Sequence, residues 1–280
     1  MQYGIIIQSG DARAFAGLAR EAEAAGWDGV FIADAIDIGL QPGSAYPMFD
    51  PWVVLAAMAM RTERVRIGTI ITPVSRRRPW KLARETMTLD QLSGGRLTLA
   101  VGLGAAEHDG GFYKVGEAMD LKARAKLLDE SLEILGGLWS GEPFSFSGEH
   151  YQVQEMTMLP RPVQSPRIPV WVVGVWPRRR SLERARRWDG IIPQKYKASP
   201  GDRMSPADIR TIKNYVDEHH PQPDRFDILA GMSTSGKSRK RALEIVRPFA
   251  EAGATWWVEE VWAAEPKLLA RIKQGPPRVE

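Results

Sequence analysis

An apolar stretch of the sequence runs directly into a cluster of positive charge. Segment 168–173 ends at a glycine, and three consecutive arginines follow a few residues later. Free backbone amides at the start of a helix, flanked by guanidinium groups, bind phosphate, so the pattern predicts an anion site. Successive helical residues lie about 100° apart, so the three arginines cannot all face one anion, and a solvated helix face is the alternative interpretation. The residues of this predicted site are Gly174, Val175, Trp176, Arg178, Arg179 and Arg180.

A second cluster of polar and basic residues lies in the stretch IGTIITPVSRRRPW. Thr69 and Thr72 stand late in an apolar, strand-like segment, and Arg76–Arg78 follow it. The threonine hydroxyls could hydrogen-bond the polar edge of a ligand, although threonine is also a common strand residue. The arginines contact an acidic ligand or form a solvated loop, and both interpretations are open.

Acidic residues and glycines follow two further apolar segments. Gly102 and Gly104 would let a planar ligand or an anion approach the backbone closely, and Glu107 after them contacts the ligand or caps a helical turn. Asp34 follows segment 29–33 and accepts hydrogen bonds from a ligand ring or substrate, or caps the next loop. Asp34 and Glu107 are therefore the catalytic candidates.

An adjacent pair of glutamates, Glu259 and Glu260, follows the last apolar segment. Consecutive strand residues point to opposite sides. We therefore expect one of the two carboxylates to face the site and the other to point away from it.

All these residues lie at the ends of apolar runs that alternate regularly with helical periodicities. Eight of each predict a (β/α)8 barrel, an α/β fold whose parallel strands are covered on both sides. The expected strands are 3–8, 29–33, 65–71, 97–101, 168–173, 190–192, 226–230 and 255–258. The expected helices are 12–25, 51–61, 79–92, 119–139, 180–188, 206–219, 237–252 and 266–272. Active sites of this fold lie in the loops after the strands, which here include 193–204 and 259–264.

We expect a single barrel domain spanning residues 1–280, with one excursion. Between the helix 119–139 and the strand 168–173, aromatic and polar residues alternate around the turn sequence SGEH, which predicts a β-hairpin. Helix 51–61 is apolar around most of its circumference, so something must cover it. A subunit interface, and hence a homodimer, is the hypothesis.

The composition excludes several classes of function. The chain is 44% hydrophobic and 26% charged with a net charge of +4, and its arginines cluster locally instead of forming the basic face of a nucleic-acid-binding protein. It has no cysteine and four histidines without an HxxxH pair, so we expect no metal. No segment reads as a leader or a membrane span. We expect a cytoplasmic protein with neither a membrane nor a nucleic-acid partner.

Several stretches resemble the bacterial luciferase-like monooxygenase superfamily of flavin- and deazaflavin-dependent oxidoreductases. They are FDPWVVLAAMAMRTERVRIGTIITPVSRRRPWKLARETMTLDQLSGGRLTLAVGLG, GEHYQV, LPRPVQSPRIPVWVVG, GATWWVE and RIKQGPPR. The resemblance implies a (β/α)8 barrel that binds FMN or coenzyme F420 at the C-terminal face of the strands. It matches Asp34 to an acidic residue after the second strand, and it implies a bulge or a non-prolyl cis peptide behind the ring at Ile70–Ile71. The implied cofactor-binding residues are Asp34, Thr69, Ile70, Ile71, Thr72, Gly102, Gly104, Ala105 and, at the phosphate, Gly174, Val175, Trp176, Arg178, Arg179 and Arg180.

The sequence departs from the family pattern at Ala35, where several F420-dependent members have a histidine. The leading hypothesis is an FMN- or F420-dependent oxidoreductase or monooxygenase acting on a small organic substrate, with NAD(P)H or a separate reductase as candidate redox partners. The basic loop Arg76–Arg78 leans toward F420, whose tail is acidic. A phosphate-binding isomerase or lyase on the same barrel and a non-catalytic flavin-binding protein are the alternatives.

Overall fold

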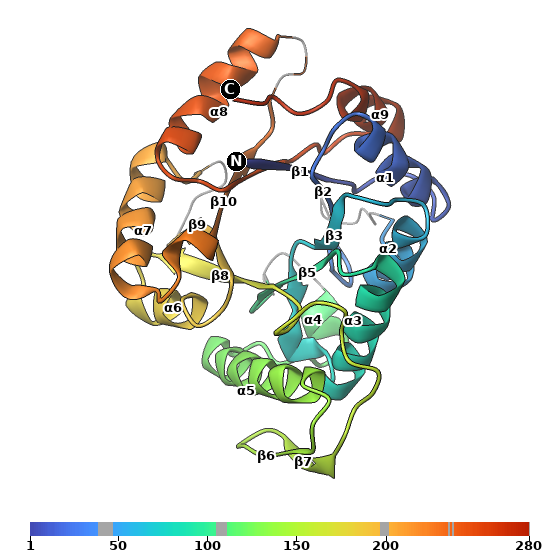
Figure 1. Cartoon of the computed structure of the whole chain (residues 1–280), viewed down its shortest axis with the longest axis vertical. Coiled ribbons are helices and arrows are strands. Elements are labelled where there is room, and N and C mark those ends of the chain that lie inside the picture. The colour runs from blue at the N-terminus through green and yellow to red at the C-terminus, as the bar shows by residue number, and fades with distance from the viewer. Residues whose placement is uncertain (39–46, 105–110, 197–201, 235, 237, 280) are drawn as a thin grey trace.

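Eight parallel strand positions close into a barrel (Figure 1). The computed structural model describes residues 1–38, 47–104, 111–196, 202–234, 236 and 238–279. Strand β1 pairs with β2 on one side and β11 on the other, and β3 pairs with β5, which completes the ring. The strands are β1 (Gln2–Ile6), β2 (Gly29–Ile32), β3 (Arg66–Thr69) continued by β4 (Thr72–Pro73), β5 (Leu97–Gly102), β8 (Val170–Trp176), β9 (Gly190–Lys195), β10 (Asp227–Met232) and β11 (Trp256–Glu259). The predicted (β/α)8 fold is confirmed.

Helices surround this ring (Figure 1). Asp50 precedes α2 and accepts hydrogen bonds from the amides of Trp52 (3.0 Å) and Val53 (3.1 Å), while Pro51 occupies the first helical position, where no donor is needed. The main helices are α1 (Ala14–Ala24), α2 (Pro51–Ala59), α3 (Pro79–Ser93), α5 (Leu121–Trp139), α6 (Arg179–Ala185), α7 (Pro206–His219), α8 (Arg239–Glu251) and α9 (Glu265–Lys273). Shorter ones are α4 (Gly111–Lys114), η1 (Val74–Arg76) and η2 (Pro223–Arg225).

The predicted excursion is the antiparallel hairpin of β6 (Phe144–Ser147) and β7 (Gln152–Met156). It lies beyond α5, away from the barrel strands (Figure 1). Glu130 of α5 accepts hydrogen bonds from the backbone amides of residues 149, 150 and 151 in the hairpin turn. This one carboxylate therefore fixes the hairpin to the helix that precedes it.

Three aromatic side chains fill the barrel interior near the N-terminal ends of the strands. The ring centroids of Phe31, Trp171 and Trp256 lie 5.2–5.9 Å apart in tilted and edge-to-face pairs, an arrangement that aromatic quadrupoles favour. Two glycines make room for them, because a Cβ at Gly4 would lie 2.5 Å from Phe31 and one at Gly190 would lie 2.5 Å from Trp171. The aromatic plug fills this end of the barrel, which leaves the opposite end for a ligand.

A half-buried acid supports the plug and gives the fold a testable pH dependence. Asp227 accepts hydrogen bonds from Trp171 Nε1 (3.0 Å) and Thr255 Oγ1 (2.9 Å), and burial raises its pKa above the ordinary value of 3.8. The folded chain therefore holds this proton more tightly than the unfolded chain, so the stability contributed by Asp227 falls as pH rises from about 3.8 through the raised pKa.

We expect the free energy of unfolding of the wild type, minus that of Asp227→Asn, to decrease over this pH interval, because the variant lacks the titrating group. Urea denaturation of both proteins at a series of pH values measures the difference. A difference that stays constant or grows with pH would contradict the assignment.

Candidate active site

A cavity of about 320 Å³ lies at the C-terminal ends of the barrel strands. Its floor is apolar because the inward-facing residues above the aromatic plug are aliphatic: Ile6, Ile70, Ile71, Ile192, Leu229 and Val258. Its rim is polar and charged, with Gln194, Lys195, Asp202, Arg203 and Glu260. An apolar pocket with a few charged groups at its edge is the usual form of a small-molecule site. We call it the mouth cavity.

The two adjacent glutamates at the end of β11 point to opposite sides, as predicted. Glu260 lines the mouth cavity and forms an ion pair with Arg203 at 3.1 Å. Glu259 is fully buried outside the cavity, where it pairs with Arg271 at 3.2 Å and accepts a hydrogen bond from the amide of Thr234 at 2.5 Å. Glu259 therefore holds α9 against the barrel, and Glu260 stands at the rim of the cavity together with Arg203.

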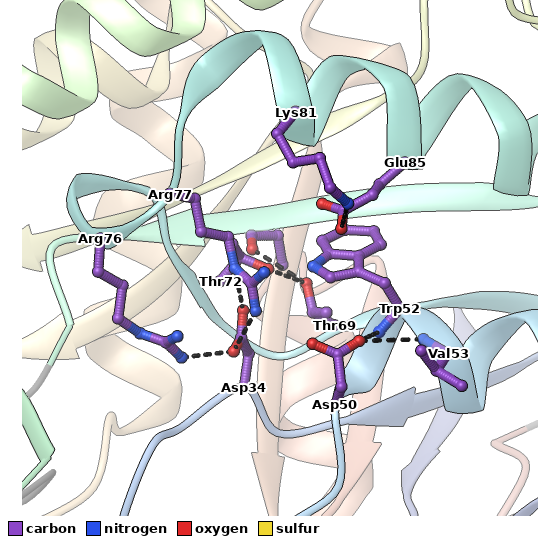
Figure 2. A network of polar contacts seen from close by, with 11 residues as sticks. Asp34, Asp50, Trp52, Val53, Thr69, Thr72, Arg76, Arg77, Lys81 and Glu85 are labelled. Carbon is purple, nitrogen blue, oxygen red and sulfur yellow. Dashed lines mark hydrogen bonds and ion pairs between the residues drawn. The ribbon is translucent and has the colours of Figure 1, made fainter.

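The end of the third barrel strand carries the predicted cis peptide. The bond between Ile70 and Ile71 is cis, and both side chains line the mouth cavity. On either side of it, Thr69 and Thr72 are fully buried, and their hydroxyl oxygens lie 2.7 Å apart in a hydrogen bond (Figure 2). The two hydroxyls bond to each other, and neither threonine is among the residues that line the mouth cavity. Their contact with a cofactor stays a prediction.

Asp34 lies at the end of β2 between two arginines of the loop after β4 (Figure 2). Its carboxylate accepts from Arg77 Nε (3.0 Å) and Nη2 (2.8 Å) and from Arg76 Nη2. The Asp34 side chain is 1% exposed, and those of Arg76 and Arg77 are 9% and 14% exposed. The three residues form a nearly buried ion cluster that fixes the loop after β4. Arg76 and Arg77, two of the three arginines that could contact the acidic tail of F420, are thus bound to Asp34. The roles of Asp34 in cofactor binding and catalysis stay predictions.

Close packing explains why glycines stand at positions 102 and 104, at the end of β5. A Cβ at Gly102 would lie 3.0 Å from Val173 and 3.1 Å from Ile71, and Gly104 has a φ of +77° with Pro73 2.9 Å from its Cβ position. Glycine lets the end of β5 pack closely against its neighbours in the wall of the cavity. Ala105 and Glu107 lie outside the described residues, so their assigned roles stay predictions.

Arg124 contacts the loop after β5 and was not among the predicted site residues. It lies in α5, is 3% exposed, and donates from Nη1 to the carbonyl oxygens of Leu103 (2.8 Å) and Gly104 (2.7 Å). The signal was present, because Arg124 stands one helical turn before Leu128 on the buried face. A buried guanidinium there positions the backbone that leaves β5.

The predicted phosphate loop lies partly at the mouth and partly outside it. Gly174 packs so closely that a Cβ would overlap Ile191, and the amide of Val175 donates to Ser181 Oγ at 2.9 Å. The guanidinium of Arg178 lies 3.8 Å from the ring centroid of Tyr196, which follows the cavity residue Lys195. Arg179 and Arg180 instead line a separate depression on the outer surface. The structure therefore brings Arg178 close to the rim, but not its two successors.

Lys195 and Arg203 were also missed individually, although the loop 193–204 was expected at the active face. Strand β9 extends to Lys195, three residues past the predicted end of this strand. Lys195 pairs with Asp208 at 3.6 Å and Arg203 pairs with Glu260, so both cations are held at the rim. Among the described residues, no cluster of histidine and acidic side chains could hold a metal ion, and no helix is long and apolar enough to cross a membrane.

Comparison with known proteins shows to which family this sequence belongs. Residues 2–274 match the luciferase-like monooxygenase family. An F420-dependent glucose-6-phosphate dehydrogenase of Nakamurella multipartita is 32% identical over 237 residues, covering 83% of this chain and 66% of that protein. The protein of the same name from Microbacterium testaceum is 30% identical over 225 residues, covering 72% of this chain and 63% of its own length. The chain thus spans slightly less than two thirds of these curated relatives.

A solved structure, the coenzyme F420 dependent tetrahydromethanopterin reductase from Methanopyrus kandleri, superposes with a TM-score of 0.76 at 18% identity. The match covers 98% of this chain and 96% of the reductase, and at this identity it shows a common fold. The family match spans nearly the whole sequence, and the barrel, the cis peptide after β3 and the apolar mouth cavity agree with it. This chain belongs to the luciferase-like monooxygenase family.

Proposed function

We propose that the protein is an oxidoreductase that binds coenzyme F420 or FMN in the mouth cavity and acts on a small organic molecule. The observation that carries the proposal is the cavity itself, with its aliphatic floor over the Ile70–Ile71 peptide and its cationic rim. The curated relatives are named as F420-dependent dehydrogenases, which supports the same class of chemistry.

The residues of the cavity fit a flavin-type group. A tricyclic redox ring has apolar faces, which the aliphatic floor would cover and shield from water, and it carries a phosphate chain that needs cations. Val175 and Trp176 of β8 pair with Gln194 and Lys195 of the rim, and Arg178 in the exit loop lies over Tyr196, the residue after Lys195. The cations Arg178 and Lys195 would hold the phosphate end, and Ile70, Ile71 and Ile192 would hold the ring.

The bound cofactor would supply the two-electron transfer or the oxygen chemistry, while the protein supplies binding, orientation and a dry pocket. The aliphatic floor excludes water from the reacting face. Lys195 and Arg203 attract an anionic group of a substrate to the rim. Because Ala35 stands where several F420-dependent members have a histidine, a carboxylate would take over proton transfer. The candidates are Asp34, Glu107 and the cavity residue Glu260.

Separate titrations of the purified protein with F420 and with FMN, followed by cofactor fluorescence, test the proposal. We expect saturable one-to-one binding of at least one of them and a change in its redox state with a reductant such as NAD(P)H or with an alcohol or other small organic substrate. If neither cofactor binds, the proposal fails. Turnover of a phosphorylated substrate without any cofactor would favour an isomerase or lyase. Tight binding without any redox change would favour a flavin carrier.

We also propose that the protein is a homodimer that uses α2. Val53, Ala57 and Met60 follow one another at helical spacing on the exposed side of this segment, and Val53 and Met60 are 71% and 66% exposed. An apolar stripe of this kind favours burial against a second copy. Light scattering should therefore give a dimer for the wild type and a monomer for Val53→Asp/Met60→Glu. The control Leu121→Glu changes an exposed apolar residue of α5 and should stay dimeric. A monomeric wild type would overturn the proposal.

A further inference from the structure

A depression of about 760 Å³ lies on the outer surface beside α6, apart from the mouth cavity. Five arginines line it together with only two acids, Asp129 of α5 and Glu183 of α6, which leaves a formal excess of three positive charges. The arginines are Arg179, Arg180, Arg184, Arg186 and Arg187. We call this region the arginine depression.

The two acids do not neutralise the arginines. Asp129 receives Arg184 through two hydrogen bonds (2.5 and 2.8 Å) and Arg187 through a longer contact of 3.3 Å. Glu183 is held by Arg186 at 2.5 Å and by Tyr215, and it lies 4.0 Å from Arg179.

Three of the guanidiniums therefore remain available to an anion. Arg179 and Arg187 are 85% and 59% exposed, and Arg180 is exposed with no carboxylate partner among the described residues. Arg184 is instead held in place by its two hydrogen bonds to Asp129. A surface with surplus guanidiniums around a hollow is suited to a ligand that carries several carboxylates or phosphates.

The first arginines of the depression follow the rim of the mouth cavity closely along the chain. Trp176 at the end of β8 pairs with the rim residue Lys195, and Arg178 lies over Tyr196. Arg179 and Arg180 begin α6 directly after this contact. A chain that leaves the rim at Arg178 therefore arrives on the arginines of α6.

We propose that the arginine depression binds the oligoglutamate tail of coenzyme F420, so that this surface distinguishes F420 from FMN. The inference rests on the proposed function, since it needs F420 in the mouth cavity with its phosphate end toward Arg178. F420 carries a chain of glutamates beyond its phosphate, and FMN ends at the phosphate. The other basic cluster of the sequence cannot take this role in the same way, because Arg76 and Arg77 are nearly buried against Asp34.

The dimensions suit such a tail. Helix α6 has seven residues, so it is about 10 Å long at about 1.5 Å per residue, and an extended chain of about three residues spans that length at roughly 3.3–3.6 Å each. A tail of a few glutamates would pass Arg179 and Arg180 first and would reach Arg187 with its distal carboxylates.

The test compares F420 carrying its glutamates with a truncated F420 that keeps the phosphate and lacks them. The variant Arg186→Gln/Arg187→Gln removes two charges at the distal part of the depression, far from the phosphate end. The matched control Arg225→Gln/Arg247→Gln removes two exposed arginines elsewhere: Arg225 precedes β10, at the closed end of the barrel, and Arg247 lies on α8. Dissociation constants come from cofactor fluorescence at low and high salt.

We expect the wild type to bind full-length F420 more tightly than the truncated form, with the difference reduced at high salt. The variant should bind full-length F420 about 3- to 10-fold more weakly, because it loses the exposed charge of Arg187 and the charge of Arg186 that offsets Glu183. Its affinity for the truncated form and that of the control for both forms should stay unchanged. Equal affinity of the wild type for the two forms, or binding of FMN but not of F420, would overturn the tail site and leave the proposed function standing. Binding of none of the three compounds would instead refute the proposed function.

Discussion

Asp34→Ala is expected to lower the free energy of unfolding by about 3–5 kcal/mol, because it leaves two nearly buried guanidiniums without a counter-charge. Both Arg76 and Arg77 donate to the Asp34 carboxylate, and their side chains are 9% and 14% exposed. Chemical denaturation of the variant beside the wild type measures the loss.

A triple variant separates the charge effect from a general intolerance of this region. In Asp34→Leu/Arg76→Met/Arg77→Met the whole ion cluster is replaced by apolar side chains of similar size, which is often nearly neutral for a buried ion group. We expect the triple variant to regain most of the stability that Asp34→Ala loses. An Asp34→Ala protein within about 0.5 kcal/mol of the wild type, the range of ordinary surface substitutions, would show that the cluster is not needed to hold the loop after β4.

Ile192→Trp should weaken binding of F420 or FMN about 10- to 100-fold while the barrel stays folded. Ile192 lines the mouth cavity and packs on the cluster that fills the barrel interior, so an indole at this position occupies space that the ring of the cofactor needs. Overpacking costs about 1–3 kcal/mol, and each 1.4 kcal/mol is about tenfold in affinity. Cofactor fluorescence titration measures the change.

Ile192→Leu is the matched control, since it keeps the volume and the apolar character of the side chain. We expect its affinity to stay within about threefold of the wild type, which is less than 1 kcal/mol. Circular dichroism of Ile192→Trp shows whether the barrel is intact. A folded Ile192→Trp protein with unchanged affinity would mean that the cofactor does not occupy the mouth cavity.

The fold could be predicted from the sequence because the signals that determine it are local. Parallel strands covered on both sides are continuous apolar runs, and every expected run contains or overlaps an observed strand, including Gly29–Ile32 and Trp256–Glu259. The alternation of aromatic and polar residues around a turn sequence predicted the hairpin between α5 and β8. Strand ends were less accurate, as at β9, where Pro193 interrupts the apolar pattern but the strand continues to Lys195.

The site could be predicted only as far as strand ends determine it. The family resemblance gave the cis bond at Ile70–Ile71, and strand alternation gave the opposite directions of Glu259 and Glu260. The partner of Asp34 could not be read in this way, because Arg76 and Arg77 are more than 40 residues away along the chain and become neighbours only when β2 and β3 pair. The direction of each arginine in Arg178–Arg180 depends on where α6 begins, which sequence patterns do not define to within one residue.

A crystal structure of the protein with whichever of F420 and FMN binds more tightly tests the central claim most directly. We predict that the ring lies in the mouth cavity against Ile70, Ile71 and Ile192, with its phosphate end toward Arg178 and Lys195. A ring bound elsewhere on the molecule, or a phosphate at the opposite side of the barrel mouth, would contradict it.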